Sequence, residues 1–394
     1  MKKKLILFIL KTTIMLLILL NFGGALSIFY PTPLVLGIFS IAIILFLLNG
    51  NFSIKKKYII FLFTSYTIIS ITIFINKVSF FDYKGIFISL FSSVIIFSSF
   101  KDIEEIKKFF IKACEIIVWL AFLNFIILIL FPNLFIETID TEGSNYRVFT
   151  IFYIFNNLGV PYKIAGIDFF RNQGVFWEPG ILQIVINILI YYRLFEENKS
   201  IKQILIPIFV LLTTASTTGM FLFAFLFTIK YLKKLDVKKI IVLLGVGFAF
   251  IPVLINDIEY KFKGDGKLSS QWRTYDTLMG LFVISRNPLT GIGISEDKYF
   301  NEMKNSFIRV NGESMNIERG NTNSIILICL YFGIPLSIVI LYKIYHQNLF
   351  KKKWLFFSLL MICLASEPLI IRTFFSLLLI SSIKVEKEKL KTIS

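Results

Sequence analysis

Apolar runs follow one another along the whole chain, separated by short polar stretches. About twelve of them are candidate membrane helices, because a helix needs about 20 mainly apolar residues to cross the hydrocarbon core of a bilayer. They cover residues 5–30, 33–48, 58–75, 85–100, 109–131, 180–192, 204–212, 219–229, 240–255, 323–342, 354–365 and 369–383. Three are short, and "LLTTASTTGMF" and "SEP" each separate two runs that form one broken helix or two short ones. The pattern predicts an all-α, polytopic integral membrane protein with a single membrane domain over residues 1–394.

Composition supports this fold class and narrows the partners. The 394 residues are 56% hydrophobic and 16% aromatic, with a mean hydropathy of +0.77, which excludes an ordinary soluble domain. The net charge of +17 raises the possibility of nucleic-acid binding. The lysines, however, fall in short clusters between apolar runs, which is typical of cytoplasmic loops. We therefore expect a lipid bilayer around the chain and no nucleic-acid partner.

The lysine clusters also predict the orientation. If the N-terminus is inside, every strong cluster lies on the cytoplasmic side, and both termini are cytoplasmic. The clusters lie at 2–4, 55–57, 101–108, 199–202, 230–239, 351–353 and 384–391. The opening stretch "MKKKLILFILKTTIMLLILL" looks like a signal peptide. No clear small-residue cleavage site follows it, so we expect a retained first helix.

Two long segments, 132–179 and 256–322, then lie outside the membrane, and arginine is concentrated in them. Six of the eight arginines belong to these segments, namely Arg147, Arg171, Arg273, Arg286, Arg309 and Arg319. Arginine grips phosphate through two parallel hydrogen bonds, whereas the inner loops use lysine almost exclusively. The bias indicates an anionic ligand at the outer face. The alternative is surface arginines that balance acids such as Asp276 and Glu296. Residues 146–170 are too polar to span, and we expect them to lie along the membrane surface.

The stretch "RNQGVFWEPG", residues 171–180, marks the border between the first outer segment and a membrane helix. Pro179 suits the first turn of that helix, and a carboxylate at Glu178 is favoured near a helix N-terminus. Trp177 suits the headgroup level. Arg171 and Glu178 together predict an anion site at the mouth of the helix with a potential base beside it. Complementation of the helix dipole remains the alternative for Glu178.

The second outer segment repeats the combination of a cation, aromatic residues and an acid. In "SSQWRTYD", Arg273 stands beside Trp272 and Asp276. Gly291 and Gly293 further along are turn glycines on this interpretation, because no strand and helix flank them as nucleotide binding requires.

Other kinds of chemistry find little support in the sequence. His346, the one histidine, lies in an inner loop, which excludes a Ser–His–Asp set outside, and no metal-ligand cluster is evident. Glu367 and Arg372 are five residues apart near the last apolar runs, and we expect them to pair with each other.

Four stretches in this order resemble the O-antigen polymerase and O-antigen ligase superfamily, which includes the Wzy-type polymerases of capsule and lipopolysaccharide repeat units. They are "RNQGVFWEPG" (171–180), "TTASTTG" (213–219), "WRTYDTLMGLFVISRNPLTGIG" (272–293) and "TNSIILICLYFGIPLSIVI" (322–340). The resemblance covers roughly residues 165–345. It implies a GT-C-like membrane glycosyltransferase at the outer face of the bacterial inner (plasma) membrane, which takes a glycan from undecaprenyl diphosphate without a cofactor or metal.

The resemblance also implies roles for individual residues. Arg171 and Arg273, with Arg286, are expected to hold the donor diphosphate, where positive charge stabilises the leaving group. Glu178 is the leading candidate for the catalytic base and Asp276 the reserve. A chain-length regulator protein is a possible partner.

Within the superfamily the residues favour a polymerase. Ligases carry a histidine just before the asparagine that opens the helix after the large loop, whereas Thr322 precedes Asn323 here. The E-P of the first stretch is typical of polymerases, although Gly180 follows where serine or asparagine is usual. An O-antigen ligase and a transporter or flippase of a lipid-linked glycan remain the alternatives.

Overall fold

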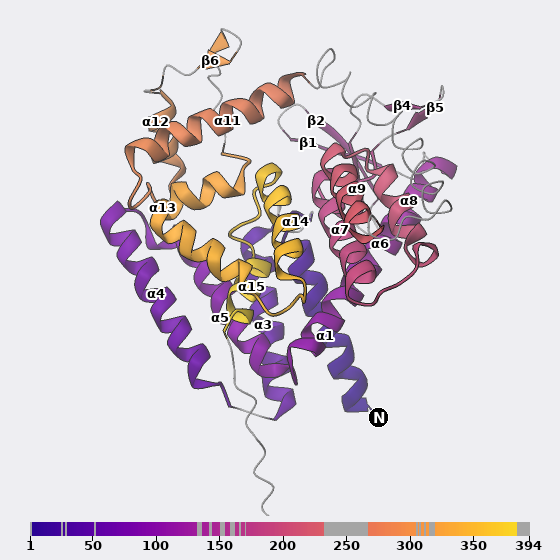
Figure 1. The fold of residues 1–394 in the computed structure, drawn as a ribbon, viewed down its shortest axis with the longest axis horizontal. Helices are drawn as coiled ribbons and strands as arrows, with labels where there is room; N and C mark the ends of the chain where they lie inside the picture. The colour runs from indigo at the N-terminus through magenta and orange to yellow at the C-terminus, as the bar shows by residue number, and fades with distance from the viewer. Residues whose placement is uncertain are drawn as a thin grey trace, which may run out of the picture.

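The structure is a computed structural model. It describes residues 2–24, 27, 30–50, 53–131, 136–141, 144–149, 154–157, 162–164, 167–169, 171–231, 267–304, 306, 309–310, 313–314 and 320–383. The described residues are predominantly helical, and most of the helices run side by side (Figure 1).

The first half of the chain forms a layer of long helices. These are α1 (Lys2–Leu20), α3 (Pro31–Asn49), α4 (Lys56–Asn76), α5 (Lys84–Ser99) and α6 (Ile103–Leu130), with the short 3-10 helix η1 (Phe80–Tyr83) before α5. The first helix packs against α3 and α6, and α5 packs against α3. Large apolar side chains such as Phe63 and Phe74, the latter 84% exposed, cover the outside of α4. Such a surface suits lipid rather than water.

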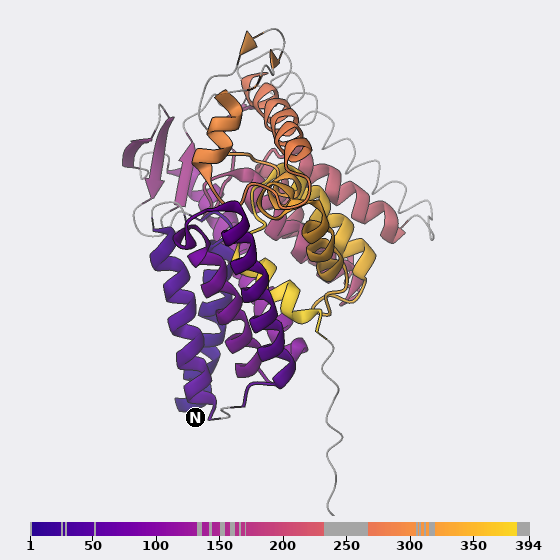
Figure 2. The same cartoon turned by 90° about the vertical axis from the view of Figure 1, so that its left-hand side faces the viewer.

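The second half packs against this layer with shorter helices. They are α7 (Pro179–Phe195), η3 (Ile201–Ile204), α8 (Leu205–Thr213), α9 (Thr217–Tyr231), α11 (Lys267–Arg286), α12 (Glu296–Lys304), α13 (Ser324–Tyr345), α14 (Lys353–Ser366) and α15 (Thr373–Ser381). Helix α7 lies against α6 and α9, and α15 lies against α5. Figure 2 shows α11 and α12 above the helix layer, at the end opposite the start of α1.

Eleven of the twelve apolar runs carry helices, and the twelfth, 240–255, lies outside the described residues. Five helical stretches are long and apolar enough to cross a membrane: Pro31–Asn49, Lys56–Asn76, Phe80–Ser99, Ile103–Ile127 and Ser324–Tyr345. The chain is thus a helical membrane protein. Four further apolar helices, in α7, η3 with α8, α9 and α14, are shorter than a usual span. "TTASTTG" and "SEP" each separate two short helices.

Short antiparallel strands in the two outer segments depart from the all-α expectation. In the first segment, β1 (Ile136–Thr141), β2 (Ser144–Phe149) and β3 (Ile154–Asn157) form one sheet, and β4 (Tyr162–Ile164) pairs with β5 (Ile167–Phe169). In the second, β6 (Arg309–Val310) pairs with β7 (Glu313–Ser314). These stretches are rich in β-branched and aromatic residues and have no long apolar period, so pairing between strands satisfies their backbone groups. The prediction of a surface-lying segment did not include these strands.

The helix α13 is broken in its middle, and the loop after α11 fills the break. Gly333 has a φ of 74° inside α13. The backbone N–H of Ile292 donates to the carbonyl of Leu330 at 2.7 Å, and that of Ile334 donates to Pro288 at 2.8 Å. Backbone groups freed within a membrane helix need such partners. The predicted turn glycines, Gly291 and Gly293, lie in this loop with φ values of 64° and 76°.

Polar connections gather at the two ends of the helices. At one end, Lys107 pairs with Glu196 at 2.8 Å, and Glu196 accepts a hydrogen bond from the backbone N–H of Lys351 at 2.9 Å. These contacts join the start of α6, the end of α7 and the connection between α13 and α14. The start of α1 and the end of α15 lie toward this end, and the strands, α11 and α12 lie toward the other (Figures 1 and 2).

Candidate functional site

The turn before α7 is fixed on two neighbouring helices by Asn172. Its backbone N–H donates to the carbonyl of Thr213 at 2.8 Å, and its amide group donates to the carbonyl of Ala121 at 2.9 Å. The amide oxygen of Asn172 accepts from the backbone N–H of Gly174, which has a φ of 57°. A positive φ is readily adopted by glycine. The sequence "RNQG" therefore makes a tight turn that has one position relative to α6 and α8.

The break between α8 and α9 fixes the direction of the Arg171 side chain. Its Nε donates to the carbonyl of Thr214 at 3.0 Å. Ala215, the next residue, is fully buried with a φ of 46°, a backbone conformation that alanine rarely adopts. Such conformations often mark functional sites. Two of the stretches singled out in the sequence, "RNQGVFWEPG" and "TTASTTG", thus form one unit.

Glu178 stands at the mouth of α7, as predicted from the sequence. It is the N-cap residue, it is exposed, and its carboxylate makes no capping hydrogen bond. Pro179 occupies the first turn. Just before it, the backbone N–H of Trp177 donates to the carbonyl of Gly23 at 2.9 Å, which joins the end of α1 to the site. The carboxylate of Glu178 therefore lies near the positive end of the helix dipole and makes no capping hydrogen bond.

Glu367, which the sequence did not mark as a site residue, is the centre of the arrangement. It lies in the connection between α14 and α15 and is 4% exposed. A Cβ atom at Gly180, in the first turn of α7, would overlap its carboxylate. The hydroxyl of Ser324 donates to the carbonyl oxygen of Glu367. A glutamate beside a proline between two apolar runs was the available signal, because ionisable groups at such places often mark function.

Arg273 comes from α11 and reaches Glu367 from the other side. Its guanidinium lies 4.0 Å from Oε1 of Glu367, and the Arg273 side chain is 49% exposed. The sequence predicted that Arg171 and Arg273 share one site. The structure brings both arginines and Glu178 within electrostatic reach of Glu367.

Burial and, after it, the nearby charge of Glu178 raise the pKa of Glu367 from 4.5 to about 8. Arg273 and Arg171 oppose this increase in the pKa. A buried carboxylate loses the hydration that stabilises its charge, which explains the direction. Because two arginines and two carboxylates meet here, the charge of the site depends on whether Glu367 carries a proton.

Asp276, the reserve base, holds two helices together. It is 2% exposed, and its Oδ2 accepts hydrogen bonds from the hydroxyl of Thr322 at 2.8 Å and from the Thr322 backbone N–H at 3.3 Å. Asn321 donates to the carbonyl of Asp276. These bonds tie α11 to the start of α13, so that the third and fourth singled-out stretches also meet. The arrangement favours a role in positioning Arg273, one turn before Asp276.

Arg286 lies apart from the other two candidate arginines. It is thirteen residues beyond Arg273 on α11, which amounts to about 20 Å along a helix. Its guanidinium donates to Glu302 of α12 at 3.0 Å and stacks 4.4 Å from the ring of Phe282. The structure therefore does not bring Arg286 together with Arg171 and Arg273. Arg147, Arg309 and Arg319 offer no side-chain test, because their side chains lie outside the described part of the chain.

The expected pair of Glu367 and Arg372 is not formed. Among the described residues, Glu367 has Arg273 as its salt-bridge partner, and Nε of Arg372 has no hydrogen-bond partner. Arg372 is the N-cap residue of α15, where the chain has already turned away from Glu367. Spacing in the sequence suggested the pair, but the turn at 367–372 separates the two side chains.

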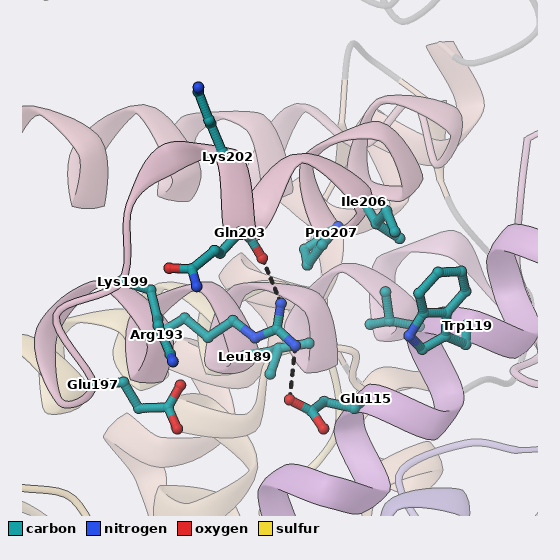
Figure 3. Close-up of a pocket in the computed structure, with 11 residues that line it drawn as sticks. Glu115, Trp119, Leu189, Arg193, Glu197, Lys199, Lys202, Gln203, Ile206 and Pro207 are labelled. Atoms are coloured by element: carbon teal, nitrogen blue, oxygen red, sulfur yellow. Dashed lines mark hydrogen bonds and ion pairs between the residues drawn. The ribbon is translucent and has the colours of Figure 1, made fainter.

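A cavity of about 480 Å³, with charged residues in its lining, lies at the opposite end of α7 (Figure 3). Arg193 crosses it and donates to Glu115 at 2.7 Å and to the carbonyl of Gln203 at 2.6 Å. Both bonds of this guanidinium are therefore made within the chain. The cavity holds none of the predicted site residues, and Arg193 is fifteen residues, or about 22 Å along the helix, from Glu178.

The site is thus a buried carboxylate with two arginines near it, of which Arg273 is exposed and Arg171 is partly buried, at the mouth of a helix. Such a group can bind a phosphate or diphosphate through bidentate hydrogen bonds and can oppose the charge of a leaving oxyanion. Within the described residues, no three His, Cys, Asp or Glu side chains form a group able to hold a metal ion.

Comparison with known proteins gives no further assignment. Neither protein-family models nor curated proteins match this chain.

Proposed function

We propose that this chain polymerises lipid-linked oligosaccharide repeat units for an O-antigen or a capsular polysaccharide. Its donor is a glycan on undecaprenyl diphosphate, and it acts at the outer face of the bacterial inner membrane. The convergence of Arg171 and Arg273 on one buried carboxylate, Glu367, carries the proposal. These residues come from three distant parts of the chain, and two of them were expected to share a diphosphate from the sequence resemblance alone.

In the proposed reaction, the two arginines bind the diphosphate of the donor. The bond between the anomeric carbon of the donor sugar and the diphosphate oxygen breaks, and the electron pair leaves with the oxygen. A hydroxyl of the acceptor repeat unit forms the new glycosidic bond. Its proton passes to the carboxylate of Glu178, which is exposed and free of capping bonds. Stabilisation of the leaving diphosphate by arginine is the main contribution of the protein.

An apolar cavity of about 310 Å³ supports a lipid-linked substrate. It lies between α4, α5, α13 and α15, and its lining includes Ile370 and Ile371 from the same connection that carries Glu367. Ile328, one turn after Ser324, lines it as well. An apolar chain in this cavity would lie next to the loop that ends at the diphosphate site, so that both parts of the substrate find matching chemistry.

The first prediction concerns the length of the polysaccharide made by cells. Arg171→Ala and Arg273→Ala, at wild-type expression, should each lower the rate of elongation by about 100-fold or more, as loss of a group that stabilises an oxyanion does. Glu178→Gln should remove the proton acceptor and shorten the product. Arg286→Ala is the matched control, because Arg286 is bound to Glu302 away from the site. Gel electrophoresis of the surface polysaccharide measures the outcome.

If Arg171→Ala and Arg273→Ala both make product of normal length, the candidate site is rejected. If only Arg286→Ala shortens the product, the diphosphate site lies at Arg286 instead. Deletion of the gene separates the classes of function. A polymerase deletion leaves single repeat units on the surface, a flippase deletion leaves none, and a ligase deletion leaves free lipid-linked polymer.

A further inference from the structure

Arg273 and Glu367 face each other from opposite environments. The Arg273 side chain is 49% exposed, whereas the Glu367 side chain is 5% exposed. An anion arriving from the open end of the site therefore reaches Arg273 without passing Glu367. At the shared distance of 4.0 Å, the two groups attract each other but are not held by a short hydrogen bond.

Glu367 cannot follow Arg273 if that arginine turns toward a ligand. Ser324 donates through its hydroxyl to the carbonyl of Glu367 and accepts from the backbone N–H of Leu369 at 2.6 Å. The carboxylate also rests against Gly180, where its Cδ would lie 3.0 Å from an added Cβ. Both the backbone and the side chain of Glu367 are thus fixed from two sides.

Charged and titratable groups face Glu367 from three elements. Arg171 and Glu178 lie in the turn before α7, Arg273 lies on α11, and Cys363 lies on α14, which ends just before Glu367. The two arginines favour the ionised carboxylate, and Glu178 disfavours it. A diphosphate bound by the arginines carries two negative charges, and these offset the two positive charges of the arginines. The ionised form of Glu367 then loses its stabilisation.

We propose that Glu367 is a positioning residue that, in the pH range where it is ionised, neutralises Arg273 in the free protein, releases it to an incoming diphosphate and takes up one proton from the solvent in exchange. The proposal deepens the proposed function, on which the identity of the diphosphate rests. The proton returns to the solvent when the diphosphate leaves and Arg273 pairs with Glu367 again. While the donor is bound, the buried carboxylate is neutral, and Glu178 keeps the role of base in the proposed function. Two carboxylates in one site commonly divide their roles in this way.

Calorimetry on the purified full-length protein tests the exchange. The probe is dimethyl diphosphate with one methyl group on each phosphate, which carries two charges and has no proton that titrates near neutral pH. Titrations in two buffers of different ionisation enthalpy give the number of protons taken up on binding. The wild type should take up about one proton where free Glu367 is ionised. In that range, the affinity of the wild type for the probe should fall by up to tenfold for each unit by which the pH rises.

Two variants complete the test. Glu367→Gln is neutral at every pH, so it should bind the probe without proton uptake, with little pH dependence, and more tightly than the wild type at alkaline pH. Glu302→Gln is the matched control, because Glu302 pairs with Arg286 outside the site, and it should keep the wild-type behaviour.

Binding by the wild type without proton uptake would overturn the proposal, and this result counts even if Glu367→Gln does not fold. Unchanged uptake in Glu367→Gln would overturn it as well. Failure of the proposed function has a different signature, because a gene deletion that leaves the polysaccharide unchanged rejects the polymerase and not the proton exchange.

Discussion

Gly180 follows Pro179 in the first turn of α7, and it carries no side chain where Glu367 needs space. An added Cβ would overlap Oε1 of Glu367. The φ of Gly180 is not in the left-handed region, so space and not backbone conformation restricts this position. Gly180 differs from the serine or asparagine that is usual in the superfamily that the sequence resembles. In this chain, its missing side chain leaves room for the carboxylate of Glu367.

Gly180→Ala should therefore disturb both stability and function. The added methyl group forces the Glu367 carboxylate away from the helix mouth, at a cost of about 1–3 kcal/mol for an overpacked site. Thermal unfolding in detergent and the length of the polysaccharide report the two effects. Gly37→Ala is the matched control. Nothing lies within 4 Å of a Cβ at Gly37, inside α3, and the change there should stabilise the protein by up to about 1 kcal/mol. Equal behaviour of the two variants would contradict the role of Gly180.

At this scale the sequence marked three residues of the candidate site but not the buried carboxylate between them. Arg171, Glu178 and Arg273 stand in recognisable patterns of cations, acids and aromatic residues. Glu367 stands in a short break between apolar runs, and its importance depends on contacts with residues that are distant in the chain. Local patterns suggested Arg372 as its partner, whereas its salt-bridge partner among the described residues is Arg273, which is distant in the chain.

Among the elements, α11 and the start of α13 act as one unit at the end of the molecule that holds the arginine site. Asp276 and Thr322 join them by hydrogen bonds, and Gly280 allows close approach, since a Cβ there would overlap the side chain of Ile326. Arg273 lies one turn before Asp276 on the same helix. The direction of the Arg273 side chain therefore depends on this joint.

Substitutions at the joint distinguish a positioning role of Asp276 from a catalytic one. Thr322→Val removes the hydrogen bond from the Thr322 hydroxyl to the carboxylate. Such a bond contributes about 1.5–3 kcal/mol when one partner is charged. The variant should shorten the polysaccharide as much as Asp276→Asn does, and Thr322→Ser should retain the wild-type length. If Asp276→Asn abolishes elongation and Thr322→Val has no effect, Asp276 takes part in the chemistry instead.

The helices were predictable because a run of apolar residues has few other ways to satisfy its backbone in a membrane. The first run is an instructive exception, since α1 ends at Leu20, ahead of two glycines, and not near residue 30. The strands of the outer segments and the break in α13 were not predictable in the same way. The break depends on contacts such as the hydrogen bond from the backbone N–H of Ile292 to the carbonyl of Leu330, two residues in separate elements.

At the scale of the whole molecule, the ends of the helices differ in chemistry. Lysine contacts such as that of Lys107 with Glu196 join the connections at one end, and the arginine site opens at the other. The start of α1 and the end of α15 lie toward the lysine end (Figure 1). The distribution of lysine in the sequence predicts that this end faces the cytoplasm.

Labelling of single cysteines tests this orientation. In a variant without Cys114, Cys329 and Cys363, a membrane-impermeant maleimide should label Asp297→Cys, on α12, in cells with a permeable outer layer and an intact inner membrane. Lys56→Cys, at the start of α4, should react only after the inner membrane is opened. Both positions are exposed. The reverse pattern would place the arginine site in the cytoplasm and contradict the proposed access to an outer substrate.

The first helix is joined to parts of the chain that are made much later. Asn21 accepts a hydrogen bond from the backbone N–H of Thr373, 352 residues further on, at 3.1 Å. At a synthesis rate of about 5–20 residues per second, the ribosome needs roughly 20–70 s to supply that partner. The end of α1 therefore enters the membrane and waits there with an open polar group. A chain that stops before Thr373 leaves the side-chain oxygen of Asn21 without this hydrogen bond.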